Sequence, residues 1–121
     1  TVDMSYEDAL VKVTEELKTA GFGIISETDV KATMKNKLDV DMKPYKILGA
    51  CNPKLAHDAI QAEQQIGLFL PCNVIVYVND EDKTVISAVD PVKMMMAVEN
   101  PQLEKTAMQV RDKLKAVIDN L

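Results

Sequence analysis

Two cysteines and a single histidine are the residues of this chain best suited to nucleophilic or redox chemistry. Cys51 comes immediately before Asn52-Pro53, where we expect a helix to begin, and the positive end of a helix dipole can lower the pKa of such a thiol. Cys72 begins an apolar run that we expect to form a neighbouring strand. The pair suggests a thiol-dependent redox protein or enzyme, with metal ligation or two structural, apolar thiols as the alternatives.

His57 is a poor partner for the Cys51 thiol. The apolar residues of the expected helix define one face of it: Leu55, Ala59, Ala62 and Ile66. At about 100° per residue, His57 falls nearly opposite that face, so we expect its ring to lie in solvent. Two cysteines and one outward histidine are also too few well-placed ligands for a zinc site. The sequence therefore implies no metal and no cofactor.

The loop Gly49-Ala50-Cys51-Asn52-Pro53 joins an expected strand to this helix. Backbone N–H groups in the first turn of a helix point outwards beside the positive end of the dipole, so the loop could bind an anion. It contains one glycine and matches no phosphate-loop or dinucleotide motif. Asn52 is also explained as a helix cap that precedes proline, so a capped helix without a ligand is the alternative.

The ligand predicted at this loop is a small anion or a protein partner. Lys46 and Lys54 flank the loop in the sequence and could supply positive charge. The predicted ligand-binding residues are Lys46, Gly49, Cys51, Asn52, Lys54 and Cys72.

The charge distribution argues against some classes of function. A net charge of −5 and five aromatic residues without tryptophan argue against a nucleic-acid-binding protein, which needs phosphate contacts and stacking platforms. Residues 31–54 nevertheless carry six lysines and two aspartates, a net charge of +4, which leaves −9 for the rest of the chain. This basic segment contains the loop and could attract an anion, although a solvated lysine-rich face is the alternative.

Length, hydropathy and cysteine number set the broad class. The 121 residues are enough for one domain, over residues 1–121, with its own hydrophobic core. No apolar run approaches the ~18 residues that a membrane-spanning helix needs, so we expect no membrane partner. Two cysteines do not make the disulfide framework of a small secreted protein, and a reducing, cytoplasmic location is therefore expected.

The periodicity of apolar residues predicts the secondary structure. Helices are expected over residues 6–20, 30–37, 53 to about 65, 91–98 and 101–121. Strands are expected over residues 1–4 (a stub), 22–28, 45–50, 73–78 and 84–90. The polar turn at residues 79–83 makes the last two strands an antiparallel hairpin. The last helix carries apolar residues at four-three spacing: Leu103, Ala107, Val110, Leu114, Val117 and Leu121.

These elements predict an α+β domain with helices packed on a four- to five-stranded, mostly antiparallel sheet. Every residue at positions 74–78 is apolar, which is typical of a central strand covered on both faces. In so small a domain a partner subunit can supply the second cover, so we expect a homodimer.

Three blocks of the sequence resemble a known family: GACNPKLAHDAI (residues 49–60), LPCNVIVYV (70–78) and SAVDP (87–91). With these blocks, and with DVKATMKNKLDVDMKPYKILGACNP (29–53), the chain resembles the prokaryotic family of domain of unknown function 302 over nearly its whole length. GACNP and LPCN look like the family's signature. The resemblance implies a compact single α+β domain that forms dimers. It implies no activity, because the family has no established catalytic residues.

Overall fold

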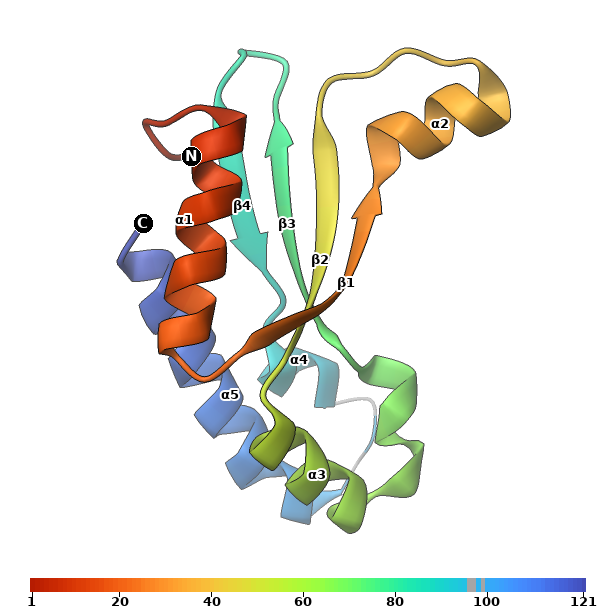
Figure 1. Cartoon of the computed structure of the whole chain (residues 1–121). Helices are drawn as coiled ribbons and strands as arrows, with labels where there is room; N and C mark the ends of the chain where they lie inside the picture. The colour runs from red at the N-terminus through yellow and green to blue at the C-terminus, as the bar shows by residue number, and fades with distance from the viewer. Residues whose placement is uncertain (96–97, 99) are drawn as a thin grey trace.

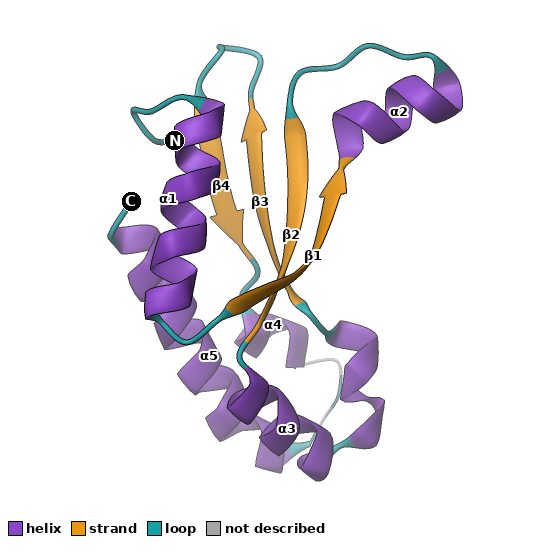
Figure 2. Ribbon diagram, viewed as in Figure 1, coloured by secondary structure: helices purple, strands orange, loops and turns teal. Residues whose placement is uncertain are grey.

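The computed structural model describes residues 1–95, 98 and 100–121. Within this part, one antiparallel sheet has the order β1 (Gly23–Asp29), β2 (Tyr45–Cys51), β3 (Cys72–Val78) and β4 (Thr84–Ala88). The helices around it are α1 (Tyr6–Thr19), α2 (Val30–Leu38), α3 (Pro53–Ala62), the 3-10 helix η1 (Gln64–Phe69), α4 (Pro91–Met95) and α5 (Pro101–Asp119) (Figure 2). The predicted α+β class, with helices packed on a four- to five-stranded antiparallel sheet, is confirmed.

Polar side chains start the helices where the sequence places them. The Ser5 hydroxyl accepts a hydrogen bond from the Asp8 N–H at 3.1 Å and begins α1. The Asn100 side chain likewise accepts from the Gln102 N–H at 3.0 Å, with Pro101 in the first turn of α5. These caps satisfy backbone donors that have no partner within the helix.

The main hydrophobic core lies between one face of the sheet and the helices α1 and α5, which run side by side (Figure 1). Its fully buried residues come from both layers and include Val13, Leu17, Leu48, Val74, Val76 and Leu114. The predicted four-three stripe of α5 is buried from Leu103 to Val117, so one face of this helix packs along its whole length.

The opposite face of the sheet is not covered by α1 or α5 (Figure 1). Since side chains alternate along a strand, this open face carries the residues between the buried ones. Its apolar members are only partly buried: Tyr45, Ile47, Ile75, Tyr77 and Val85. The rings of Tyr45 and Tyr77 stack across the two central strands, with centroids 5.2 Å apart. β3 is an inner strand, as predicted, with one face packed and the other partly exposed.

Most boundaries agree with the prediction to within two residues, and three elements differ further or are described only in part. The stub at residues 1–4 makes a single bridge, Val2 to Thr84, rather than a strand. The third helix ends at Ala62 instead of about residue 65, because Glu63 adopts extended backbone angles and its carboxylate accepts from the Gln65 N–H to start η1. The helix expected over 91–98 is described to Met95, and the remainder of that prediction involves residues 96, 97 and 99, which lie outside the described part.

Candidate functional site

A cavity of about 300 Å³ lies at the end of the sheet where β2 passes into α3. Its wall is formed mainly by aliphatic side chains of α3, η1 and α5, among them Leu55, Ala59, Ile66, Leu103, Ala107 and Val110. Three of the predicted site residues belong to the same wall: Cys51, Asn52 and Cys72. The junction ahead of Pro53 therefore faces a cavity of the size that small-molecule sites commonly have.

Gly49 lies behind this wall, in a position where only glycine fits. The residue is buried, and a methyl group on it would overlap the Ser26 hydroxyl and lie 2.8 Å from Cγ of Pro71. Gly49 therefore permits the segment before β3 to approach β2 closely. Its contribution to the site is this close approach rather than a loop that wraps around a ligand.

The two predicted lysines are separated from each other. Lys54 is exposed in the first turn of α3, beside the loop. Lys46 pairs with Asp29 and Val76 near the opposite end of β2, and five residues of extended strand place it about 16 Å from Cys51. The structure thus brings Lys54, but not Lys46, to the cavity end of the sheet.

Asn52 begins α3 as its cap. Its side-chain oxygen accepts a hydrogen bond from the Leu55 N–H at 3.3 Å, and Pro53 occupies the first turn. The side-chain oxygen of Asn52 therefore already accepts one hydrogen bond from the helix. Asn52 accordingly has a full structural explanation in addition to its place in the cavity wall.

The two cysteines are free thiols that line the same cavity from adjacent strands. Cys72 is buried and pairs across the sheet with Ala50, whereas Cys51 is partly exposed at the end of β2. Burial, and secondarily the neighbouring Cys51, raise the pKa of the Cys72 thiol to about 11. Cys72 is therefore protonated at neutral pH, a state in which a thiol is a weak nucleophile.

His57 lies in solvent, as the helical geometry predicted. The residue is exposed on α3, and its ring nitrogen Nε2 is 3.4 Å from the side-chain nitrogen of Gln61. Among the described residues, no three side chains of the histidine, cysteine, aspartate or glutamate types gather so that they could hold a metal ion. In the same described part, no helix combines the length and the apolar character needed to cross a membrane.

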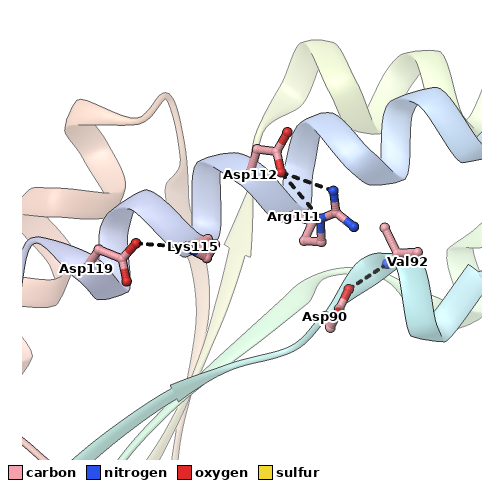
Figure 3. A network of polar contacts seen from close by, with 6 residues as sticks. All are labelled: Asp90, Val92, Arg111, Asp112, Lys115 and Asp119. Atoms are coloured by element: carbon pink, nitrogen blue, oxygen red, sulfur yellow. Dashed lines mark hydrogen bonds and ion pairs between the residues drawn. The ribbon is translucent and has the colours of Figure 1, made fainter.

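A second, more open hollow lies between α5 and the segment that joins β4 to α4, and four of its eight lining residues are charged: Asp90, Arg111, Asp112 and Lys115. Figure 3 shows the polar contacts of these residues. Arg111 pairs with Asp112 at 3.3 Å and Lys115 with Asp119 at 3.2 Å, while the Asp90 carboxylate accepts the Val92 N–H at 3.0 Å. Each of these charged groups pairs with a neighbour on the same helix or accepts an N–H from the start of a helix, so they are explained without a ligand.

Sequence reasoning missed the far wall of the cavity. Leu103, Thr106 and Ala107 of α5 belong to it, although they are about fifty residues from the loop. Ile25 of β1 also lines it, at a point where the register with β2 shifts between Ile24 and Ser26. The available signal was the apolar stripe of α5, which continues from Leu103 to Val117 and so predicts a buried face along the whole helix.

An antiparallel sheet with helices on one face and an apolar cavity at one end places the protein among small α+β domains with a candidate ligand pocket. The chain belongs to the family described as "Domain of unknown function DUF302", whose model matches residues 1–121. It is similar to the crystal structure of an uncharacterized conserved DUF302 protein from Bacillus stearothermophilus, with 28% identity over 98% of this chain and 91% of that one, and a TM-score of 0.91. No match was found among curated proteins.

Proposed function

We propose that the protein is a small-molecule-binding domain whose ligand occupies the cavity beside the 49–53 loop. The observation that carries the proposal is the cavity itself, because three of the residues predicted to bind a ligand, Cys51, Asn52 and Cys72, line it. Pockets of this kind are the usual sites for small ligands in domains of this size.

An anionic group on the ligand would lie at the start of α3. The first turn of a helix favours negative charge, and the Lys54 side chain is exposed in that turn. Lys46 is too distant to take part, so the positive potential comes from Lys54 and the helix rather than from two flanking lysines.

Titration with inorganic phosphate, followed by NMR shifts of backbone amides, tests the anionic group. We expect shifts concentrated at residues 52–55 and binding about two- to fivefold weaker in Lys54→Gln, the size of an exposed charge contribution. Lys31→Gln, which removes an exposed lysine of the same basic segment from α2, should bind like the wild type. Equal losses in both variants, or shifts spread over all lysines, would contradict a defined anion site.

We also infer a homodimer in which a second copy covers the open sheet face. The partly exposed residues Tyr45, Ile47, Ile75, Tyr77 and Val85 form an apolar surface of the kind that subunit contacts bury. α2 adds to this inference, because its nine residues include no buried one and so short a helix is marginal in water by itself.

Light scattering tests the dimer. We expect twice the chain mass for the wild type, a monomer for Val85→Glu on the open face, and a dimer for Val11→Glu, which places the same charge at an exposed valine of α1. A monomeric wild-type mass at tens of micromolar would remove the inference.

A thiol-dependent function is the alternative, and the shared cavity of Cys51 and Cys72 favours it. The raised pKa of Cys72 weighs against it, since a redox pair needs an accessible thiolate. Cys51→Ser separates the two functions, because a binding domain keeps its ligand whereas a thiol enzyme loses turnover. Two free thiols also fit a reducing, cytoplasmic location.

A further inference from the structure

We propose that the body of the ligand is an unbranched alkyl chain of about ten non-hydrogen atoms, held in the cavity between α3 and α5. This inference rests on the proposed ligand-binding function and names the chemical class of the ligand. The anionic group discussed above would then be the polar end of a small amphiphile.

The wall of the cavity selects against polar ligands. Among the described residues of the wall, the side chains with oxygen or nitrogen atoms are those of Asn52 and Thr106, and the Asn52 oxygen already accepts the Leu55 N–H. A sugar, a nucleotide or an amino acid would bury several polar groups here without partners, which is strongly unfavourable. An alkyl chain has no such groups and gains from every apolar atom that leaves water.

Small residues of two helices line the space and leave room in it. Ala56 and Ala59 of α3 and Ala107 of α5 all belong to the wall. The volume of about 300 Å³ corresponds to about ten groups of the size of a water molecule, each of which takes up ~30 Å³ in the liquid. A methylene group is of similar size, so a chain of this length fills the cavity.

The opening of the cavity is apolar as well. Ile25 and Ile60 both line it and are 64% and 40% exposed, which makes them two of the large apolar side chains that the fold leaves in water. Ile25 lies at the register shift of β1, where a residue has no cross-strand partner. This irregularity explains why its side chain departs from the regular alternation of the strand. Exposed apolar residues around an opening are typical of sites that take up apolar ligands.

A chain-length series of straight alkanoates, from butanoate to dodecanoate, tests the proposal by calorimetry or by NMR. We expect affinity to increase about fourfold for each added methylene and to stop increasing at about eight to ten carbons, when the cavity is full. Equal affinity across the series would overturn the proposal. So would an increase without a break, which indicates adsorption to the surface, or tight binding of aromatic acids when alkanoates do not bind.

Filling the cavity should shorten the preferred chain. In Ala107→Leu the increase should stop about three carbons earlier, while Ala116→Leu, at an exposed position of the same helix, should match the wild type. Ala56→Leu, at a partly exposed position of the wall, gives the same test if Ala107→Leu does not fold. An unchanged break point in a folded wall variant would overturn the proposal.

The two proposals fail in different ways. If decanol binds as tightly as decanoate and with the same chain-length break, the alkyl chain is supported and the anionic group is not. If phosphate binds at residues 52–55 but alkanoates of all lengths bind alike, the anion site stands and the alkyl chain is overturned.

Discussion

The two hydrophobic clusters in the described part of the chain are packed differently. The larger one joins the sheet to α1 and α5 through regular elements, and Val13, Leu17, Leu48, Val74 and Val76 are at most 1% exposed in it. The buried members of the smaller one, among the described residues, are Ala59, Ile66 and Leu103, and it is built on α3, η1 and the first turns of α5.

The cavity lies along the boundary between these clusters, with Leu55 and Cys72 of the larger one and Ile66 and Leu103 of the smaller one in its wall. Long helices and a continuous sheet can interdigitate side chains to full density, whereas short helical segments with alanines on their inner face leave space. The apolar cavity therefore lies where two short segments, α3 and η1, pack against α5.

The largest predicted effect distinguishes the two clusters by stability. Leu48→Ala should lower the free energy of unfolding by about 3–4 kcal/mol, because it opens a cavity in a rigid, densely packed core. Ile66→Ala should cost about 2 kcal/mol, since the surroundings are already loosely packed and η1 can relax. Urea denaturation of both variants measures the difference. Equal losses would mean that the smaller cluster is as tightly packed as the larger one.

The second prediction concerns Cys72, the buried thiol at the boundary. Its pKa is raised from 9.0 to about 11 in the folded protein, so between these pH values the unfolded chain releases a proton that the folded protein retains. The contribution of the Cys72 thiol to the free energy of unfolding is therefore fully present below pH ~9. It falls by about 2–3 kcal/mol as the pH rises from ~9 to ~11.

Urea denaturation at several pH values between 8 and 11.5 measures this loss. Other groups titrate in the same range, so Cys72→Ala is the control and should show a flatter pH dependence even if its stability at pH 8 is lower. Cys51→Ala removes only the smaller cause of the raised Cys72 pKa and should keep most of the wild-type slope. A slope that does not change in Cys72→Ala would show that its thiol does not carry the effect.

The third prediction concerns the close approach of Gly49 on β2 to Ser26 and Pro71. Gly49→Ala should cost about 1–3 kcal/mol, the range for overpacking, because the new methyl group meets Ser26 and Pro71. Adding Ser26→Ala removes the hydroxyl and should restore part of the loss, whereas the contact with Pro71 persists. Thermal denaturation of the single and double variants measures both effects. A Gly49→Ala variant as stable as the wild type would contradict this close approach.

The sequence predicted the larger cluster well and the site less well. The four-three stripe of α5, the caps at Asn52 and Asn100, and the antiparallel hairpin are local patterns, and each is confirmed. The cavity depends on α5 lying against α3, a contact between segments about fifty residues apart that no local pattern contains.

Lys46 shows how distance along the chain misleads. Five residues of helix span about 7.5 Å, but five residues of strand span about 16 Å. Lys46 lies on β2 and is therefore remote from the loop that it appeared to flank, although Lys54, on the first turn of α3, stays beside it. The exposure of His57 was predicted correctly, because His57 and the buried residues Leu55 and Ala59 lie on the same helix, where residue spacing fixes the direction of each side chain.

The smallest predicted effect is at His57, and it tests whether only the inner face of α3 contributes to the smaller cluster and the site. The ring is exposed and its single polar neighbour is Gln61 in the described contacts, so His57→Ala should change stability by less than about 0.5 kcal/mol and leave chain-length selectivity unaltered. Ala59→Gly, two residues further on the buried face of the same helix, should cost about 1 kcal/mol and enlarge the cavity. Urea denaturation and the alkanoate series on both variants measure this. A loss of ligand binding in His57→Ala would place a functional group on the outer face of α3 and move the site away from the cavity.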